Sequence, residues 1–258
     1  MKPAEQSQIS AGFLFCAVFN FVCWFMKLFV GTSGYAYKEW TGAFYPEKLP
    51  QKEMLAYYAA QFSTVEINYT FRQLPSPSVV ESWVQQVPAS FRFVLKARQI
   101  ITHFKRLQSA ESETDDFLRI ASVLKDRQGP ILFQLPPNFK KDVSRLAAFL
   151  IHLHGRAKAA FEFRHATWFD VDVYDCLRQH GAALCVADAE DLPATDLVRT
   201  TSWGYVRLRE EGYTDKTLCE WINEIRSQGW GEAYVFFKHE DSAAGPKLAT
   251  RFLELAGF

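Results

Sequence analysis

The segment Ala159-Ala160-Phe161-Glu162-Phe163 is a short apolar run that contains a single carboxylate, and a helical pattern follows it at Val173–His180. A run of this length, rich in aromatic residues, is typical of a strand. The same order of strand and helix recurs along the chain from Lys27 onward. Such alternation indicates βαβ units and a parallel sheet.

We expect eight short apolar strands, at Leu28–Gly31, Thr64–Asn68, Arg92–Lys96, Ile131–Leu135, Ala159–Phe163, Ala183–Asp188, Tyr205–Leu208 and Ala233–Lys238. We also expect eight crossovers, and helical periodicity is clear at Glu53–Phe62, Ser78–Gln86, Glu113–Asp126, Val143–His154, Val173–His180, Thr217–Gln228 and Pro246–Ala256. Eight units close a barrel, and 258 residues is an ordinary length for one such domain. The predicted fold class is therefore α/β, a (β/α)8 TIM-type barrel.

Composition narrows the class of function. The chain is 48% hydrophobic, which argues against disorder, and its 29 basic residues balance 29 acidic ones. Without a broad cationic surface, nucleic acid is not an expected partner. Five widely spaced cysteines form no C-x-x-C pair, which favours a reducing compartment, the cytoplasm. We expect the cysteines in predicted elements, Cys185 and Cys219, to pack rather than react.

The amino terminus carries an apolar run from Ala11 to Met26. It is shorter than the roughly 20 residues of a spanning helix, and it lacks the basic start and cleavage site of a signal peptide. Met26 leads straight into the first predicted strand. We interpret residues 1–25 as an extension and residues 26–258 as one barrel domain, with a signal or anchor and a structural helix as alternatives. No stable membrane association is expected.

Strand alternation predicts which side chains enter the barrel. In Val65-Glu66-Ile67-Asn68 the aliphatic pair can face the helices while the polar pair faces the interior. The same argument places polar groups from other strands at one mouth, namely Lys96, Gln134, Glu162, Arg164, Asp188, Arg207 and Lys238. Burying unpaired charges is costly, so this convergence indicates either an ionic network or a ligand site. We favour a ligand site, because barrel enzymes place their chemistry at this mouth.

Cations outnumber carboxylates in this set, which predicts a carboxylate or phosphate ligand. The candidate catalytic residues are Glu66, Glu162, Asp188 and His165. The candidate substrate-binding residues are Gly34, Tyr35, Asn68, Lys96, His103, Gln134, Arg164, Trp168, Arg207 and Lys238. No cofactor is predicted, although Glu66, Glu162, Asp188, His103, His165 and His239 are types that bind manganese or zinc, so a divalent metal remains an alternative.

Several motifs in order resemble one known family. They include Gly31-Thr32-Ser33-Gly34-Tyr35, Val65-Glu66-Ile67-Asn68, Ile101-Thr102-His103, Gln134-Leu135-Pro136-Pro137-Asn138-Phe139 and Glu162-Phe163-Arg164-His165. From about Met26 to Phe258 the chain is similar to domain-of-unknown-function family 72, the YecE-like proteins. The resemblance implies a TIM-type barrel, a start near Met26 and no agreed activity. The chain departs from the family pattern at Arg72-Gln73, Arg209-Glu210 and Lys238-His239-Glu240. If these positions touch the ligand, the specificity differs here or the activity has been lost.

Three functions remain open. The first is a metal-independent enzyme acting on a small phosphorylated or carboxylated substrate, with Glu162 or Glu66 as acid or base and Arg164, Arg207 and Lys96 holding the anion. The second is a metal-dependent barrel enzyme resembling sugar isomerases or apurinic endonucleases, with Glu66, Glu162, Asp188 and His165 as ligands; this is an analogy of fold. The third is a non-catalytic protein that binds an anion. The sequence does not indicate the oligomeric state.

Overall fold

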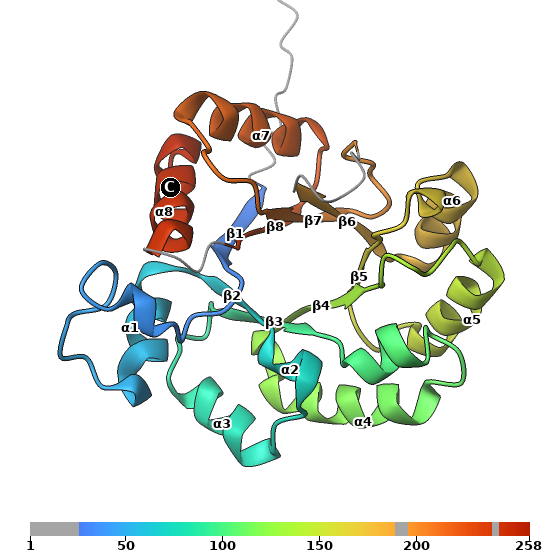
Figure 1. The fold of residues 1–258 in the computed structure, drawn as a ribbon, viewed down its shortest axis with the longest axis horizontal. Coiled ribbons are helices and arrows are strands. Elements are labelled where there is room, and N and C mark those ends of the chain that lie inside the picture. The colour runs from blue at the N-terminus through green and yellow to red at the C-terminus, as the bar shows by residue number, and fades with distance from the viewer. Residues whose placement is uncertain (1–25, 189–195, 239–242) are drawn as a thin grey trace, which may run out of the picture.

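A computed structural model describes residues 26–188, 196–238 and 243–258 of the protein (Figure 1). Eight parallel strands form a (β/α)8 TIM-type barrel, which confirms the predicted fold. The strands are β1 (Lys27–Thr32), β2 (Thr64–Ile67), β3 (Arg92–Lys96), β4 (Gln128–Gln134), β5 (Ala159–Glu162), β6 (Ala183–Asp188), β7 (Trp203–Leu208) and β8 (Glu232–Phe237).

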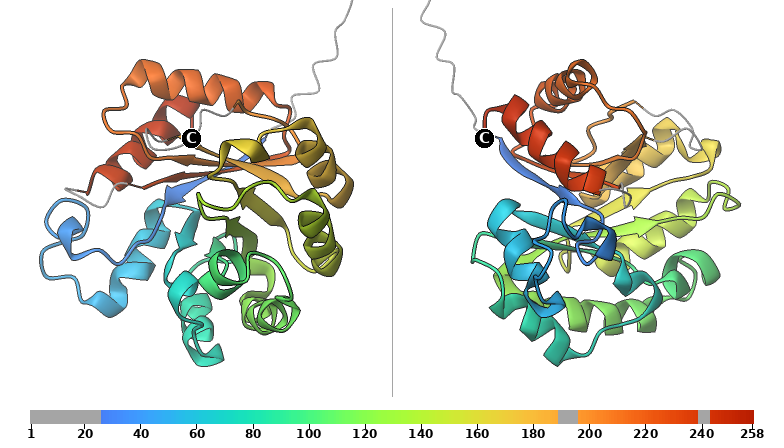
Figure 2. Two further views of the ribbon diagram at one scale, coloured as in Figure 1. Left: turned by 45° about the vertical axis from the view of Figure 1, so that its right-hand side comes forward. Right: turned by 60° about the vertical axis from the view of Figure 1, so that its left-hand side comes forward.

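The helices surround the strands, as the views in Figure 2 show. They are α1 (Met54–Gln61), α2 (Tyr69–Arg72), α3 (Pro77–Gln85), α4 (Glu111–Ala121), α5 (Val143–Leu153), α6 (Val171–His180), α7 (Asp215–Ser227) and α8 (Ala244–Ala256). The helix expected at Glu113–Asp126 ends early, at Ala121, where the chain tightens into a 3-10 helix over Ser122–Arg127; within it Lys125 has a φ of 51°. The short α2 was not predicted. Between β6 and β7, residues 196–202 contain no helix.

The predicted extension, residues 1–25, lies outside the described residues. Within residues 26–188, 196–238 and 243–258, no helix is long and apolar enough to cross a membrane. The N-terminal prediction therefore stays a prediction.

The barrel closes between β1 and β2 through an isolated bridge rather than a continuous ladder. A single bridge joins Ser33 to Glu66, and the Gly34 N–H donates to the Glu66 carbonyl over 2.8 Å. A Cβ atom on Gly31 would collide with the Thr64 carbonyl oxygen. Only glycine allows the two strands to approach this closely.

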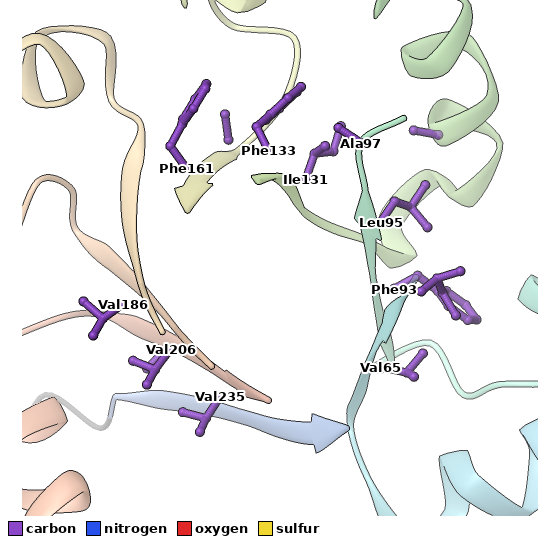
Figure 3. Close-up of a cluster of buried hydrophobic side chains, with 14 of the residues drawn as sticks. Val65, Phe93, Leu95, Ala97, Ile131, Phe133, Phe161, Val186, Val206 and Val235 are labelled. Carbon is purple, nitrogen blue, oxygen red and sulfur yellow. The ribbon is translucent and has the colours of Figure 1, made fainter. Parts of the chain in front are cut away.

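Alternation along the strands divides the core in two. Outward side chains such as Val65, Phe133 and Val206 pack toward the helices (Figure 3). Inward side chains fill the barrel itself, among them Phe29, Val94, Leu132, Ala160, Cys185, Tyr205, Tyr234 and Phe236. On five strands the next inward position toward the carboxyl end is polar, at Lys96, Gln134, Glu162, Arg207 and Lys238.

Candidate functional site

Three charged side chains enter the barrel just above its apolar filling. Glu66 on β2, Glu162 on β5 and Arg207 on β7 alternate with residues that belong to the outer core. Their exposed fractions are 0%, 0% and 2%. The predicted inward direction of all three is therefore what the structure has.

Arg207 joins the two carboxylates. Its Nη1 donates to Glu162 Oε2 over 2.6 Å, and its Nη2 donates to Glu66 Oε1 over 2.8 Å. Ser33 Oγ lies 3.5 Å from the same Nη2. Charge-assisted hydrogen bonds this short are the strong kind, and their burial away from water strengthens them further.

The remaining carboxylate oxygens have their own donors. The Tyr205 hydroxyl donates to Glu66 Oε2 over 2.6 Å. Glu162 Oε1 accepts from Gln134 Nε2 over 2.7 Å and from Arg164 Nε over 2.9 Å. Lys96 Nζ in turn donates to Gln134 Oε1 over 2.9 Å. We call Glu66, Glu162, Arg207, Arg164 and Lys96 the buried charge network.

The network lowers the pKa of two of its members, which favours the charged form of Glu162 and the neutral form of Lys96. Burial alone would raise the pKa of Glu162, but Arg207, Arg164 and Lys96 overcome it and hold that pKa at about 2. Burial, aided by the charge of Arg207, lowers the pKa of Lys96 to about 8 although Glu162 and Glu66 oppose the change. Near neutral pH Glu162 is thus ionised, while Lys96 can lose its proton readily.

One aromatic ring connects Lys96 to a histidine. Lys96 Nζ lies 4.4 Å from the centre of the Phe71 ring, which forms a T-shaped pair with the His103 ring at 4.9 Å between centroids. Thr102 Oγ1 lies 2.9 Å from His103 Nδ1. Burial, followed by the charges of Lys96 and Arg164, lowers the pKa of His103 to about 4, so this imidazole is neutral at pH 7.

Two cations in the network keep unused donors. The terminal nitrogens of Arg164 donate to no described residue, and the Arg164 side chain is 17% exposed. The half-buried Lys96 ammonium has one hydrogen-bond acceptor, Gln134, among the described side chains. These donors therefore have no further acceptor among the described residues.

The structure contradicts the prediction that the Asp188 side chain faces the mouth of the barrel. Cys185 belongs to the inner core, so alternation puts Asp188 in phase with the outward Leu184 and Val186. Its Oδ2 accepts from the Tyr213 hydroxyl over 2.7 Å, beside α7. Asp188 therefore lies outside the buried charge network.

The structure also contradicts the prediction that Trp168 binds substrate. It is fully buried, stacks on Phe163 at 4.6 Å and donates from Nε1 to the Phe139 carbonyl over 2.7 Å. These contacts stabilise the loop after β5. Trp168 has no surface left for a ligand.

The other predicted residues lie around the network. His165 Nδ1 accepts from the Thr167 N–H over 3.2 Å in the turn after β5. Lys238 follows β8 in phase with the inward Phe236. Gly34, Tyr35 and Asn68 line a separate cleft after β1 and β2.

The four residues of the metal alternative do not converge. Asp188 is on the outer face, His165 is engaged in its own turn, and the oxygens of Glu66 and Glu162 already accept from protein donors. No group of three His, Cys, Asp or Glu side chains suited to a metal ion occurs within the described part of the chain. His239 lies outside it.

Sequence reasoning missed three residues that shape the site. Tyr205 lies two positions before Arg207 on the same strand, so the period of two could have found it. Ser33 lies in the turn after β1, and no sequence pattern pairs its hydroxyl with Arg207. Phe71 belongs to the unpredicted α2, and no local pattern pairs it with Lys96.

The fold and the site together define a TIM-barrel protein with a buried charge network at the carboxyl ends of its strands. The chain belongs to the family described as "Protein of unknown function DUF72", whose sequence profile matches residues 29–258. This confirms the resemblance inferred from the motifs. The family description names no activity.

Individual relatives support the same family assignment. UPF0759 protein YunF of Bacillus subtilis is 28% identical over 227 residues, 82% of this chain and 78% of YunF. UPF0759 protein YecE of Escherichia coli K12 is 35% identical over 113 residues, 43% of this chain and 42% of YecE. The crystal structure of a DUF72 family protein from Thermotoga maritima matches with a TM-score of 0.75 and 28% identity, covering 89% of this chain and 98% of that one.

Proposed function

We propose that the protein is a metal-independent enzyme that binds a small carboxylated or phosphorylated substrate at the mouth of the barrel, through Lys96 and Arg164. The observation that carries this proposal is the charge balance of the buried network, in which three cations surround two carboxylates. An uncompensated charge away from water is costly, and an anionic ligand would compensate it. Enzymes with this fold work at this mouth.

Our proposal gives the carboxylates roles that differ from the predicted ones. Glu162 is a weak base, because its pKa is about 2 and both of its oxygens accept hydrogen bonds. Lys96, with a pKa of about 8, is better matched to proton transfer near neutral pH. In our proposal Lys96 transfers a proton to or from the substrate, while Glu66, Arg207 and Glu162 hold the site rigid.

The three thiols in the described part of the chain take no part in the proposed chemistry. Cys176 and Cys185 are buried free cysteines, and burial raises the pKa of both. Cys219 is free and half-buried on α7. Such thiols pack rather than react, and they fit the reducing cytoplasm, where we propose that the protein acts.

Calorimetric titration with inorganic phosphate and with acetate tests the binding step. The wild type should bind, and Lys96→Met and Arg164→Met should each weaken binding about tenfold or more, since each removes a charge-assisted bond. Lys158→Met is the matched control, because Lys158 pairs with Glu232 at the opposite end of the barrel. Equal binding by wild type and Lys96→Met would overturn the anion site.

Turnover of a panel of phosphate esters and carboxylates tests catalysis. Lys96→Arg keeps a positive charge but cannot release its proton near neutral pH, so it should retain anion binding and lose turnover. Turnover that survives in Lys96→Arg would remove Lys96 from proton transfer. Binding without turnover of any compound would instead favour the non-catalytic binding protein.

A further inference from the structure

A cleft of about 710 Å³ lies beside the mouth, where the segments after β1 and β2 meet α3. Its volume falls in the usual range of small-molecule sites. Its walls are mostly aromatic and aliphatic, formed by Tyr35, Tyr37, Tyr69, Leu74, Val79 and Trp83. The lining residues carry no formal charge. Polar groups come from Asn68, Gln73 and Ser76.

Hydrogen bonds hold the walls of this cleft in place. The Tyr37 hydroxyl donates to the Ser33 carbonyl over 2.7 Å, and the Tyr45 hydroxyl donates to the Tyr35 carbonyl over 2.6 Å. Two other lining residues, Tyr69 and Val79, are 51% and 41% exposed. The cleft therefore presents preformed apolar surface to water, which is a feature of ligand sites.

The short helix α2 links the cleft to the buried charge network. Tyr69 at its start lines the cleft, whereas Phe71, two residues on, packs beneath the Lys96 ammonium. Thr70 Oγ1 donates to the Lys96 carbonyl over 2.7 Å, which fastens the helix to β3. A second link is the Gly34 N–H, which donates to the Glu66 carbonyl. Neighbouring residues of α2 thus contact the cleft and the buried charge network.

We propose that the cleft binds the flat aromatic part of the substrate whose anionic group is held by Lys96 and Arg164. The inference rests on the proposed function and narrows it: the substrate class is aromatic carboxylates or phosphate esters. The tyrosines and Trp83 offer ring faces and edges for stacking. The uncharged lining suits an apolar ring. The charged group of the ligand would instead bind to Lys96 and Arg164.

Titration with phenyl phosphate and methyl phosphate tests the proposal. In the wild type phenyl phosphate should bind about tenfold tighter or more, because only its ring reaches the aromatic walls. Val79→Trp, which fills the cleft, should abolish that advantage and leave methyl phosphate binding unchanged. Tyr69→Ala, which removes one wall, should reduce the advantage. Ile151→Trp is the control, because Ile151 is exposed on α5 away from the cleft.

The outcomes separate the cleft from the anion site. Equal affinity of the wild type for both phosphates, or an advantage that survives Val79→Trp, overturns the cleft proposal while methyl phosphate binding still supports the anion site. If neither phosphate binds, the proposed function fails, and the neutral probe benzyl alcohol tests the cleft alone. Binding of benzyl alcohol that Val79→Trp abolishes supports an aromatic site, and no binding overturns it.

Discussion

Replacing Arg207 with methionine removes the guanidinium that joins Glu66 to Glu162 while roughly keeping the side-chain volume. Removing one partner of a buried ion pair costs about 3–5 kcal/mol, because the other charge stays buried and unpaired. Here one substitution affects two carboxylates. A domain is stable by only about 5–15 kcal/mol, so we expect the variant to be close to unfolding at pH 7.

The pH dependence of this loss gives the sharper measurement. Since one pKa unit corresponds to about 1.4 kcal/mol, lowering the pKa of Glu162 from 4.5 to about 2 contributes about 3 kcal/mol at pH 7. The folded-state pKa is depressed, so this contribution is complete above the unfolded-state value and is lost as the pH falls from 4.5 to about 2. The loss of unfolding free energy in Arg207→Met, relative to the wild type, should become smaller over the same pH range.

Urea unfolding followed by tryptophan fluorescence, at pH 7 and at pH 3, measures both effects. Arg251→Met is the matched control, because Arg251 pairs with Asp215 and Glu254 on the exposed surface and its loss should leave the midpoint nearly unchanged. A deficit for Arg207→Met below about 1 kcal/mol at pH 7, the size typical of surface pairs, would refute the reasoning. So would a deficit as large at pH 3 as at pH 7.

Two further predictions concern Lys96 and Gly31. Acetylation of Lys96 by acetic anhydride, followed by mass spectrometry with Lys158 as internal reference, should rise as the pH passes through about 8, because only the neutral amine reacts; a flat profile between pH 7 and 9 would contradict the lowered pKa. Gly31→Ala should destabilise the fold by about 1–3 kcal/mol or more in urea unfolding, since the new methyl group collides with the Thr64 carbonyl. An unchanged midpoint would mean that β1 and β2 can separate.

Much of the site could be predicted because strand alternation is a local property. In β2 and β5 a carboxylate lies between apolar neighbours, so the contrast within each strand shows which face is inward. Strand β6 has no such contrast. Both of its faces are apolar up to Asp188, so the sequence does not indicate which face is inward, and the prediction for Asp188 was wrong.

The sequence by itself determined the order of the eight strands and of every helix except α2, the barrel, the family, and the inward direction of Glu66, Glu162 and Arg207. Only the tertiary structure decided which groups pair. Arg207 lies 141 residues from Glu66 and 45 from Glu162, and they meet because the closed barrel brings three separate strands to one depth. The tertiary structure also decides the pKa values of Glu162 and Lys96, since they depend on burial and on charges that come from other strands.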